Sequence, residues 1–254
     1  MTTETERAGD AMRAATAGQR LVEAGGPFLA WLADWFDALP DVTLAEAVPD
    51  PARAALISVD VVNGFCYEGP LSSPRIAGIV APIAALMRAA HAAGVTRFVL
   101  VQEAHAPHAP EFAQFGPHCV RGTPQAETVA AFQALPLADS FVVLGKNSIS
   151  PAEGTDLRAW LDAPAQAPVD TFLAVGDCTD LCLYQLGMFL KLRANAADRP
   201  ARVIVPADCV QTYDLPVAAA AAIGALPHAG DLLHLIFLYH LALNGCTVVR
   251  HVGG

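Results

Sequence analysis

Short apolar segments rich in β-branched residues alternate along this chain with longer segments whose apolar residues repeat at helical spacing. The short segments lack polar–apolar alternation, so both faces of each strand would be buried. They lie near residues 54–60, 97–102, 140–145, 170–175, 202–206 and 246–250. Helical patterns lie near residues 75–93, 124–135, 155–163, 180–196, 215–225 and 230–244. This order predicts a doubly wound, three-layer α/β fold with a six-stranded parallel sheet.

The first predicted strand begins at residue 54, which divides the chain into two parts. Residues 1–53 are expected to form an N-terminal helical extension, because apolar residues between Phe28 and Leu39 recur at helical spacing. We expect this extension to pack on the core or on a partner subunit, and the chain to form a homo-oligomer in the latter case. Residues 54–254 are expected to form the main α/β domain.

The composition of the chain limits which partners it can bind and in which cellular compartment we expect it. A net charge of −10 disfavours nucleic acid as a partner. The longest apolar segment considered, residues 232–243, is too short to cross a bilayer, so we expect no membrane association. The acidic start of the chain lacks the features of a secretory signal, and its six scattered cysteines suit a reducing compartment as free thiols. A cytoplasmic location is therefore expected.

Reactive side chains follow four of the predicted strands. Asp60 ends the first strand, and Glu103 and His105 follow the second. Lys146 ends the third, and Cys182 follows the fourth at the start of a helical segment. Ligands of open parallel sheets bind beyond the carboxyl ends of the strands, so these residues should meet. A cysteine in the first helical turn lies near unpaired N–H groups that stabilise a thiolate, which makes Cys182 a candidate nucleophile.

The segments around these residues resemble those of the isochorismatase-like cysteine hydrolases. They read Ser58-Val-Asp-Val-Val-Asn-Gly-Phe-Cys, Leu144-Gly-Lys-Asn and Gly176-Asp-Cys-Thr-Asp-Leu-Cys. The resemblance implies the isochorismatase-like fold and a triad of Cys182 as nucleophile, Asp60 as proton acceptor and Lys146 as the cation that orients both. It also implies an oxyanion hole formed by the N–H groups of Cys178 and Cys182, with a cis peptide bond before Cys178. Cys178 is the alternative nucleophile, although it precedes the helical turn.

The segment from Glu103 to Glu127 is similar to the metal-binding region of nicotinamidases within that superfamily. The resemblance implies a divalent zinc, iron or manganese ion, and mixed nitrogen and oxygen ligands do not separate these metals. The implied ligands are Glu103, His105, Glu111 and His118. Glu103 replaces the usual aspartate of that family, and Glu111 replaces a frequent histidine. His108 is an alternative ligand.

Phe65 and Phe115 match positions at which the family places aromatic walls around the substrate ring. Val62 replaces a common glutamine, and the segment after Lys146 lacks a tyrosine present in some nicotinamidases. The resemblance implies a small-molecule amide substrate, with nicotinamide hydrolysed to nicotinate and ammonia as the best single reaction. The alternatives are an amidase for a carbamoyl or ureido substrate without a bound metal, and a non-catalytic binding protein on the same fold.

Overall fold

The computed structural model of the chain describes residues 16–163 and 168–253. It divides into two compact units, one ending at Leu39 and the other running from Pro40 to Gly254. The division precedes the expected boundary at residues 53 and 54. Strand β1 (Asp41–Thr43) explains this, because it pairs in parallel with β9 (His251–Gly253) at the other end of the second unit. Residues 1–15 of the expected extension lie outside the described residues.

The described part of the first unit is the helix α2 (Ala17–Asp37). The helix was predicted from the apolar residues that begin at Phe28. It starts earlier than these residues, because Thr16 and Gln19 form a capping box. The Gln19 amide donates to Thr16 Oγ1 at 3.2 Å, and the Thr16 amide donates to Gln19 Oε1 at 2.8 Å. These two bonds satisfy N–H groups that a helix start otherwise leaves without acceptors.

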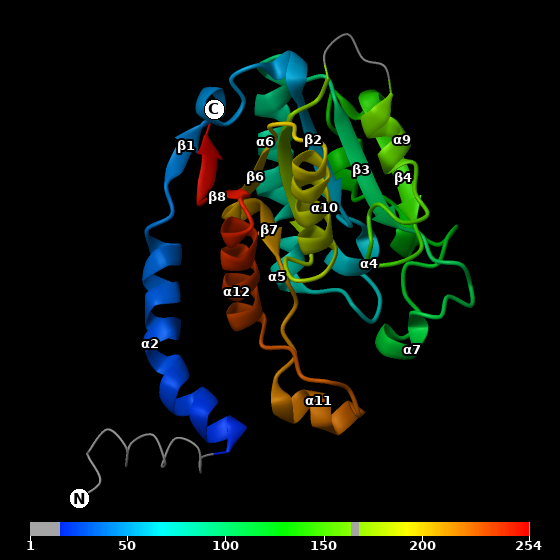
Figure 1. The fold of residues 1–254 in the computed structure, drawn as a ribbon. Coiled ribbons are helices and arrows are strands. Elements are labelled where there is room, and N and C mark those ends of the chain that lie inside the picture. Colours follow the sequence, from blue (N-terminus) through cyan, green and yellow to red (C-terminus); the bar gives the residue numbers. More distant parts are fainter. Residues whose placement is uncertain (1–15, 164–167, 254) are drawn as a thin grey trace, which may run out of the picture. The chain divides into compact units, whose positions relative to one another are not determined.

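The second unit is built on a parallel sheet that contains all six predicted strands (Figure 1). These are β2 (Ala54–Val59), β3 (Phe98–Glu103), β4 (Phe141–Lys146), β5 (Thr171–Asp177), β6 (Arg202–Pro206) and β8 (Thr247–Val249). Their spatial order is β4-β3-β2-β5-β6-β8, and every neighbouring pair is parallel. A seventh strand, β7 (Val210–Gln211), extends the pairing of β5 at its carboxyl end. Two residues are too few to produce a recognisable strand pattern, so β7 was not predicted.

The strand order reverses between β2 and β5, which makes their carboxyl ends the place where this kind of sheet binds ligands. The two strands approach closely there because Gly176 pairs with Val59 and adopts a φ of +114°. A Cβ atom at residue 176 would lie 2.0 Å from the Val59 carbonyl oxygen. Only glycine fits this position without moving the backbone.

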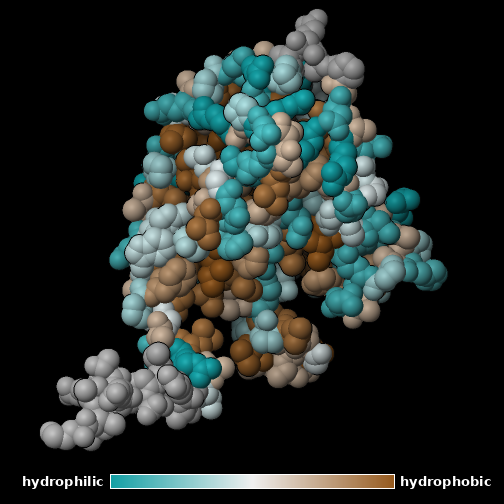
Figure 2. Space-filling view, in the orientation of Figure 1, coloured by the Kyte–Doolittle hydropathy of each residue, from teal (hydrophilic) through white to brown (hydrophobic). Residues whose placement is uncertain are grey.

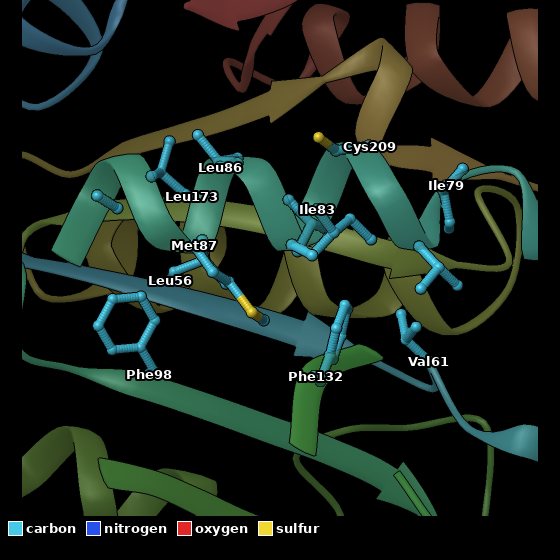
Figure 3. Packing of buried hydrophobic residues seen from close by; sticks show 14 of the residues in the cluster. Leu56, Val61, Ile79, Ile83, Leu86, Met87, Phe98, Phe132, Leu173 and Cys209 are labelled. Atoms are coloured by element: carbon cyan, nitrogen blue, oxygen red, sulfur yellow. The ribbon is translucent and has the colours of Figure 1, made fainter. Parts of the chain in front are cut away.

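Helices cover both faces of the sheet. Figure 3 shows α6 lying across one face, where Ile83 and Met87 pack with Leu56 and Phe98. On the opposite face α10 contacts β5, β6 and α12 (Figure 1). The helices of the second unit are α3 (Leu44–Ala47), α4 (Asn63–Cys66), α5 (Pro74–Ala77), α6 (Val80–Ala92), α7 (Phe112–Phe115), α8 (Ala130–Gln133), α9 (Leu157–Asp162), α10 (Cys182–Ala196), α11 (Val217–Ile223) and α12 (Gly230–Leu243). Short 3₁₀ turns span Pro51–Arg53, Pro124–Ala126, Ala138–Ser140 and Ala207–Cys209. The three-layer arrangement is the one predicted.

The predicted helix over residues 124–135 is present only in part. The segment begins as a 3₁₀ turn, is extended at Glu127, and is an α-helix only in α8. Thr128 forms an isolated bridge with Val62 and donates its hydroxyl to Gln102 Oε1 at 3.0 Å. These tertiary contacts outweigh the local helix preference of an alanine-rich segment.

One helical stretch of the described residues, Pro74–Ala92, has the length and composition of a membrane-spanning helix. Its α6 part supplies Ile83, Leu86 and Met87 to the hydrophobic core on the sheet (Figure 3), so it has the burial of a core helix. Apolar side chains are instead exposed around α11, where Val217 and Ile223 face solvent (Figure 2). All six cysteines are buried and free, as expected.

Candidate active site

Asp60 directly follows β2 and is completely buried. Its backbone has a φ of +57°, a left-handed conformation that is costly for residues other than glycine and occurs often at functional sites. The Glu103 amide donates to Asp60 Oδ1 at 2.8 Å, which orients the carboxyl group. Burial raises the pKa of Asp60 to about 6, while the Lys146 ammonium acts in the opposite direction.

Lys146 ends β4 and places its ammonium between two carboxylates. Its Nζ lies 2.8 Å from Asp60 Oδ2 and 2.8 Å from Glu103 Oε1. It also donates to the Ser148 carbonyl oxygen at 3.0 Å and to Cys182 Sγ at 3.5 Å. Burial alone would lower the pKa of Lys146, but the charges of Asp60 and its other neighbours raise it well above its ordinary value. The side chain is therefore a buried cation.

Cys182 is the first residue of α10, and its Sγ lies 3.9 Å from Glu103 Oε1. The expected cis peptide bond is present between Asp177 and Cys178. Burial raises the pKa of the Cys182 thiol well above its ordinary value, and Lys146 only partly opposes this effect. Burial therefore opposes formation of the thiolate, so a neighbouring base such as Asp60 is needed to accept the proton of Cys182, as the resemblance implies.

Cys178 lies at the same end of β5 and is also buried. Its Sγ donates to the carboxylate of Asp177 at 3.7 Å. Burial raises the pKa of the Cys178 thiol, and the Asp177 charge raises it further. Lys146 contacts Cys182, so the geometry favours Cys182 over Cys178 as the sulfur that reacts.

Three of the expected metal ligands converge beside the triad. Glu103 Oε2 lies 2.9 Å from His118 Nε2 and 3.2 Å from His105 Nε2, and the two Nε2 atoms are 3.2 Å apart. All three residues are buried. With metal–ligand bonds of about 2.1 Å, tetrahedral ligand atoms lie about 3.4 Å apart. This group would need to open only slightly to hold an ion.

The other ring nitrogens of both histidines face acceptors. His118 Nδ1 lies 2.8 Å from the Gly116 carbonyl oxygen. His105 Nδ1 lies 3.3 Å from Asn147 Oδ1, an atom that also accepts from the Ala106 amide at 2.8 Å. With an ion bound, each Nδ1 would donate to its acceptor, and the two Nε2 atoms on the side of Glu103 would be free to act as ligands. A carboxylate oxygen and two such nitrogens suit a divalent cation, so the residues fit the implied metal.

The other two candidate ligands do not join this group. Glu111 is half-buried, and its Oε2 accepts from the Ile149 amide at 3.2 Å. His108 is exposed, three residues beyond His105. Among the described residues, the ligand atoms that gather here come from Glu103, His105 and His118.

Aromatic rings surround the histidines. The rings of Phe65 and Phe115 lie 5.7 and 6.4 Å from that of His118. Phe112, which was not predicted, lies 5.2 Å from His105 and 5.7 Å from His118. The three phenylalanines thus gather aromatic surface beside the histidines, and such surface stacks well on flat molecules.

The isochorismatase domain model matches residues 54–232, from the first strand of the sheet into α12. The chain belongs to the isochorismatase family. The curated relative nicotinamidase 1 of Arabidopsis thaliana is 29% identical over 216 residues, which cover 79% of this chain and 87% of that protein.

Solved structures of this family have the same fold. N-carbamoylsarcosine amidase from Thermoplasma acidophilum is 25% identical with a TM-score of 0.57, covering 78% of this chain and 96% of that one. The zinc complex of pyrazinamidase from Pyrococcus horikoshii is 22% identical with a TM-score of 0.58, covering 78% of this chain and 99% of that one. The protein is therefore an isochorismatase-family hydrolase.

In this isochorismatase-family hydrolase, the structure brings Asp60, Lys146 and Cys182 together with Glu103 and the two histidines. The contact between Lys146 and Glu103 was not predicted, because each side chain was assigned to a different part of the site. Nothing in the sequence indicated a role for Asn147 beyond its place next to Lys146. Its role depends on its contact with His105, and no spacing in the sequence indicates that contact.

Proposed function

We propose that this hydrolase is a cysteine amidohydrolase that converts nicotinamide to nicotinate and ammonia. The observation that carries the proposal is the buried Lys146 ammonium, 2.8 Å from Asp60 and 3.5 Å from Cys182. The adjacent group of Glu103, His105 and His118 would hold a metal ion, and such an ion favours a substrate with a ring nitrogen over an aliphatic amide. The similarity to a plant nicotinamidase supports the same substrate class.

In the first half of the reaction, the Cys182 sulfur attacks the amide carbon as its proton passes to Asp60. The carbonyl oxygen becomes an oxyanion, and the new carbon–sulfur bond completes a tetrahedral intermediate. Asp60 then returns the proton to the amide nitrogen, because ammonia leaves readily only when the nitrogen is protonated. The carbon–nitrogen bond breaks, and the acyl group remains on Cys182 as a thioester.

In the second half, Asp60 takes a proton from a water molecule that attacks the thioester carbon. The carbon–sulfur bond breaks, the sulfur regains a proton, and the carboxylic acid is released. Lys146 keeps the Asp60 carboxylate and the Cys182 sulfur in place throughout. The N–H group of Cys178, directly after β5, and that of Cys182, at the start of α10, would stabilise the oxyanion in both halves.

Glu103, His105 and His118 would hold a zinc, iron or manganese ion. When bound, such an ion supplies a Lewis acid that binds a pyridine-type nitrogen and positions the amide. The ring would lie among Phe65, Phe112 and Phe115, where stacking and desolvation favour a flat aromatic substrate. In this proposal the three protein ligands determine which substrate binds, and Cys182 and Asp60 break the bond.

The test is release of ammonia from nicotinamide by the metal-loaded protein. We expect Cys182→Ala to reduce kcat by at least about 10³-fold, because the covalent step is lost. Cys178→Ala keeps the backbone N–H of residue 178 and serves as the matched control, with a much smaller loss expected. Full turnover by Cys182→Ala would contradict the nucleophile assignment.

A second candidate is an amidase for a carbamoyl or ureido substrate, favoured by the similarity to N-carbamoylsarcosine amidase. The hydrogen bonds of Glu103 with Lys146 and His118 allow the site to remain ordered without an ion. Turnover of ureido amides by protein from which a chelator has removed any metal, without activity on nicotinamide, would support this candidate. Absence of turnover on the whole amide panel would favour a binding protein.

A further inference from the structure

The segment Cys178–Cys182, here called the nucleophile loop, contains a carboxylate that the proposed reaction does not use. The side chain of Asp180 is only 6% exposed. Its Oδ1 accepts from the Thr212 hydroxyl at 2.6 Å, and its Oδ2 lies 2.8 Å from His228 Nε2. Both partners belong to the chain between β7 and α12, so Asp180 fastens the nucleophile loop to a separate part of the unit.

His228 can contribute two N–H donors to this connection. Its Nε2 faces the Asp180 carboxylate, and its Nδ1 lies 2.9 Å from the Tyr213 carbonyl oxygen. Both neighbours are acceptors, so the ring is placed to connect the nucleophile loop with the backbone of Tyr213. A hydrogen bond to an ionised carboxylate is stronger than one between two neutral groups.

The partners of Asp180 are themselves firmly held. The backbone of His228 exchanges two hydrogen bonds with Leu215, at 2.7 and 2.8 Å. The Tyr213 ring stacks on the His228 ring with centroids 3.8 Å apart. Thr212 is completely buried. The loop gains a further bond from the Thr179 amide to the Gln211 carbonyl oxygen at 3.0 Å.

We infer that Asp180, Thr212 and His228 are positioning residues that hold the nucleophile loop, and with it Cys182 and the N–H of Cys178, in the reactive arrangement. The inference deepens the proposed cysteine amidohydrolase function and rests on it for its effect on turnover. Asp180 lies two residues from each of these two cysteines. Any displacement of Asp180 therefore shifts both the attacking sulfur and the oxyanion donors, and small displacements in such sites cost large factors in rate.

Thr212 offers the sharpest test, because two substitutions separate its hydroxyl from its shape. Thr212→Val keeps the volume and removes the donor to Asp180, whereas Thr212→Ser keeps the donor. We expect Thr212→Val to lower kcat by about tenfold to a hundredfold with KM and metal affinity unchanged. We expect Thr212→Ser to retain kcat within about threefold of wild type. Thr155→Val is the matched control, since Thr155 also donates at 2.6 Å, but to the Pro151 carbonyl oxygen away from the loop.

The second readout is independent of any amide substrate. The rate of Cys182 alkylation by iodoacetamide, followed by mass spectrometry of the peptide that contains it, should change in Thr212→Val and Asp180→Asn. It should not change in Thr155→Val. A protein with no turnover on any amide, but with this alkylation response, would disprove the proposed function and uphold the positioning role. Lower melting temperatures in Thr212→Val, with wild-type kcat and alkylation rate, would overturn the inference.

Discussion

The Nζ atom of Lys146 lies 2.8 Å from Oε1 of Glu103, while the other oxygen of Glu103 faces His105 and His118. One buried side chain therefore contacts both the candidate triad and the candidate metal ligands. The ammonium also lies 2.8 Å from Asp60, so two carboxylates share one cation. Removal of that cation would leave both negative charges without compensation in a buried place.

Lys146→Gln is expected to abolish turnover and to lower the free energy of unfolding by about 3 kcal/mol, because it breaks a buried ionic group. Lys191→Gln is the natural control, since Lys191 is the other lysine of the sequence and donates to the Ala201 carbonyl oxygen, an uncharged acceptor, at 3.2 Å. Urea denaturation followed by circular dichroism measures both variants. Equal stability of the two would show that Lys146 does not compensate the carboxylates.

The metal ligands can be separated by single alanine substitutions. His105→Ala and His118→Ala should weaken zinc binding by at least about 100-fold, since each removes a converging ring nitrogen. Glu111→Ala and His108→Ala should leave the zinc affinity within about threefold of wild type, because neither side chain joins the ligand group. Competition with a chromophoric chelator measures the affinities. A loss in Glu111→Ala as large as that in His118→Ala would assign Glu111 to the ligand set.

Asp60→Asn removes the proton acceptor and retains the shape of the side chain. Asparagine tolerates the left-handed backbone of residue 60 better than alanine does. We expect kcat to fall by about 10²- to 10⁴-fold, the usual contribution of general acid–base catalysis. The variant should still bind substrate in equilibrium dialysis. Wild-type kcat in Asp60→Asn would remove Asp60 from the proposed proton transfers.

Gly176→Ala should destabilise the fold strongly, because the new Cβ atom would meet the Val59 carbonyl oxygen. We expect a loss of more than about 3 kcal/mol, well beyond the cost of about 1 to 2 kcal/mol for a left-handed alanine. Gly154→Ala isolates the latter cost, since Gly154 has a φ of +72° and open space around it. Thermal denaturation compares the two, and similar losses would contradict the close approach of β2 and β5.

His234 in α12 provides a pH-dependent term in stability. Its Nδ1 lies 2.9 Å from the Thr179 hydroxyl, and burial lowers its pKa from 6.5 to about 4, with Arg75 acting in the same direction. In the unfolded chain His234 thus binds a proton below pH 6.5, whereas in the folded chain it binds one only below about pH 4. Stability should fall as the pH falls through this window, by up to about 3 kcal/mol. His234→Gln should show a correspondingly weaker pH dependence in denaturant titrations, and identical slopes would refute this origin.

The sheet was predictable because each strand carries its own signal. Segments such as Ala54–Val59 and Thr171–Asp177 are apolar on both faces, and burial on both sides explains that pattern. The helix predicted over residues 124–135 is shortened to α8, because Thr128 bonds to Gln102, a residue distant in the sequence. The short strands β1, β7 and β9 exist only through their partners, so their own residues do not reveal them.

The candidate site was predictable where chemistry and strand position coincide, as for Asp60, Lys146 and Cys182. Contacts that join separate segments were not predictable from spacing. The ion pair between Lys146 and Glu103 and the bond between His228 and Asp180 both connect residues far apart in the chain. No sequence signal marks His228, and only the fold brings it to the nucleophile loop.

The connection between β3 and α8 supplies both histidines and two of the three phenylalanines of the site, whereas Asp60, Lys146 and Cys182 come from three other connections of the sheet. In the proposed reaction, substrate preference and bond cleavage would thus be encoded in separable stretches of the gene. Mutations confined to one surface crossover can diversify the molecules that bind, and selection can preserve the reacting groups without change. Glu103 is the exception, because a change there alters both properties at once.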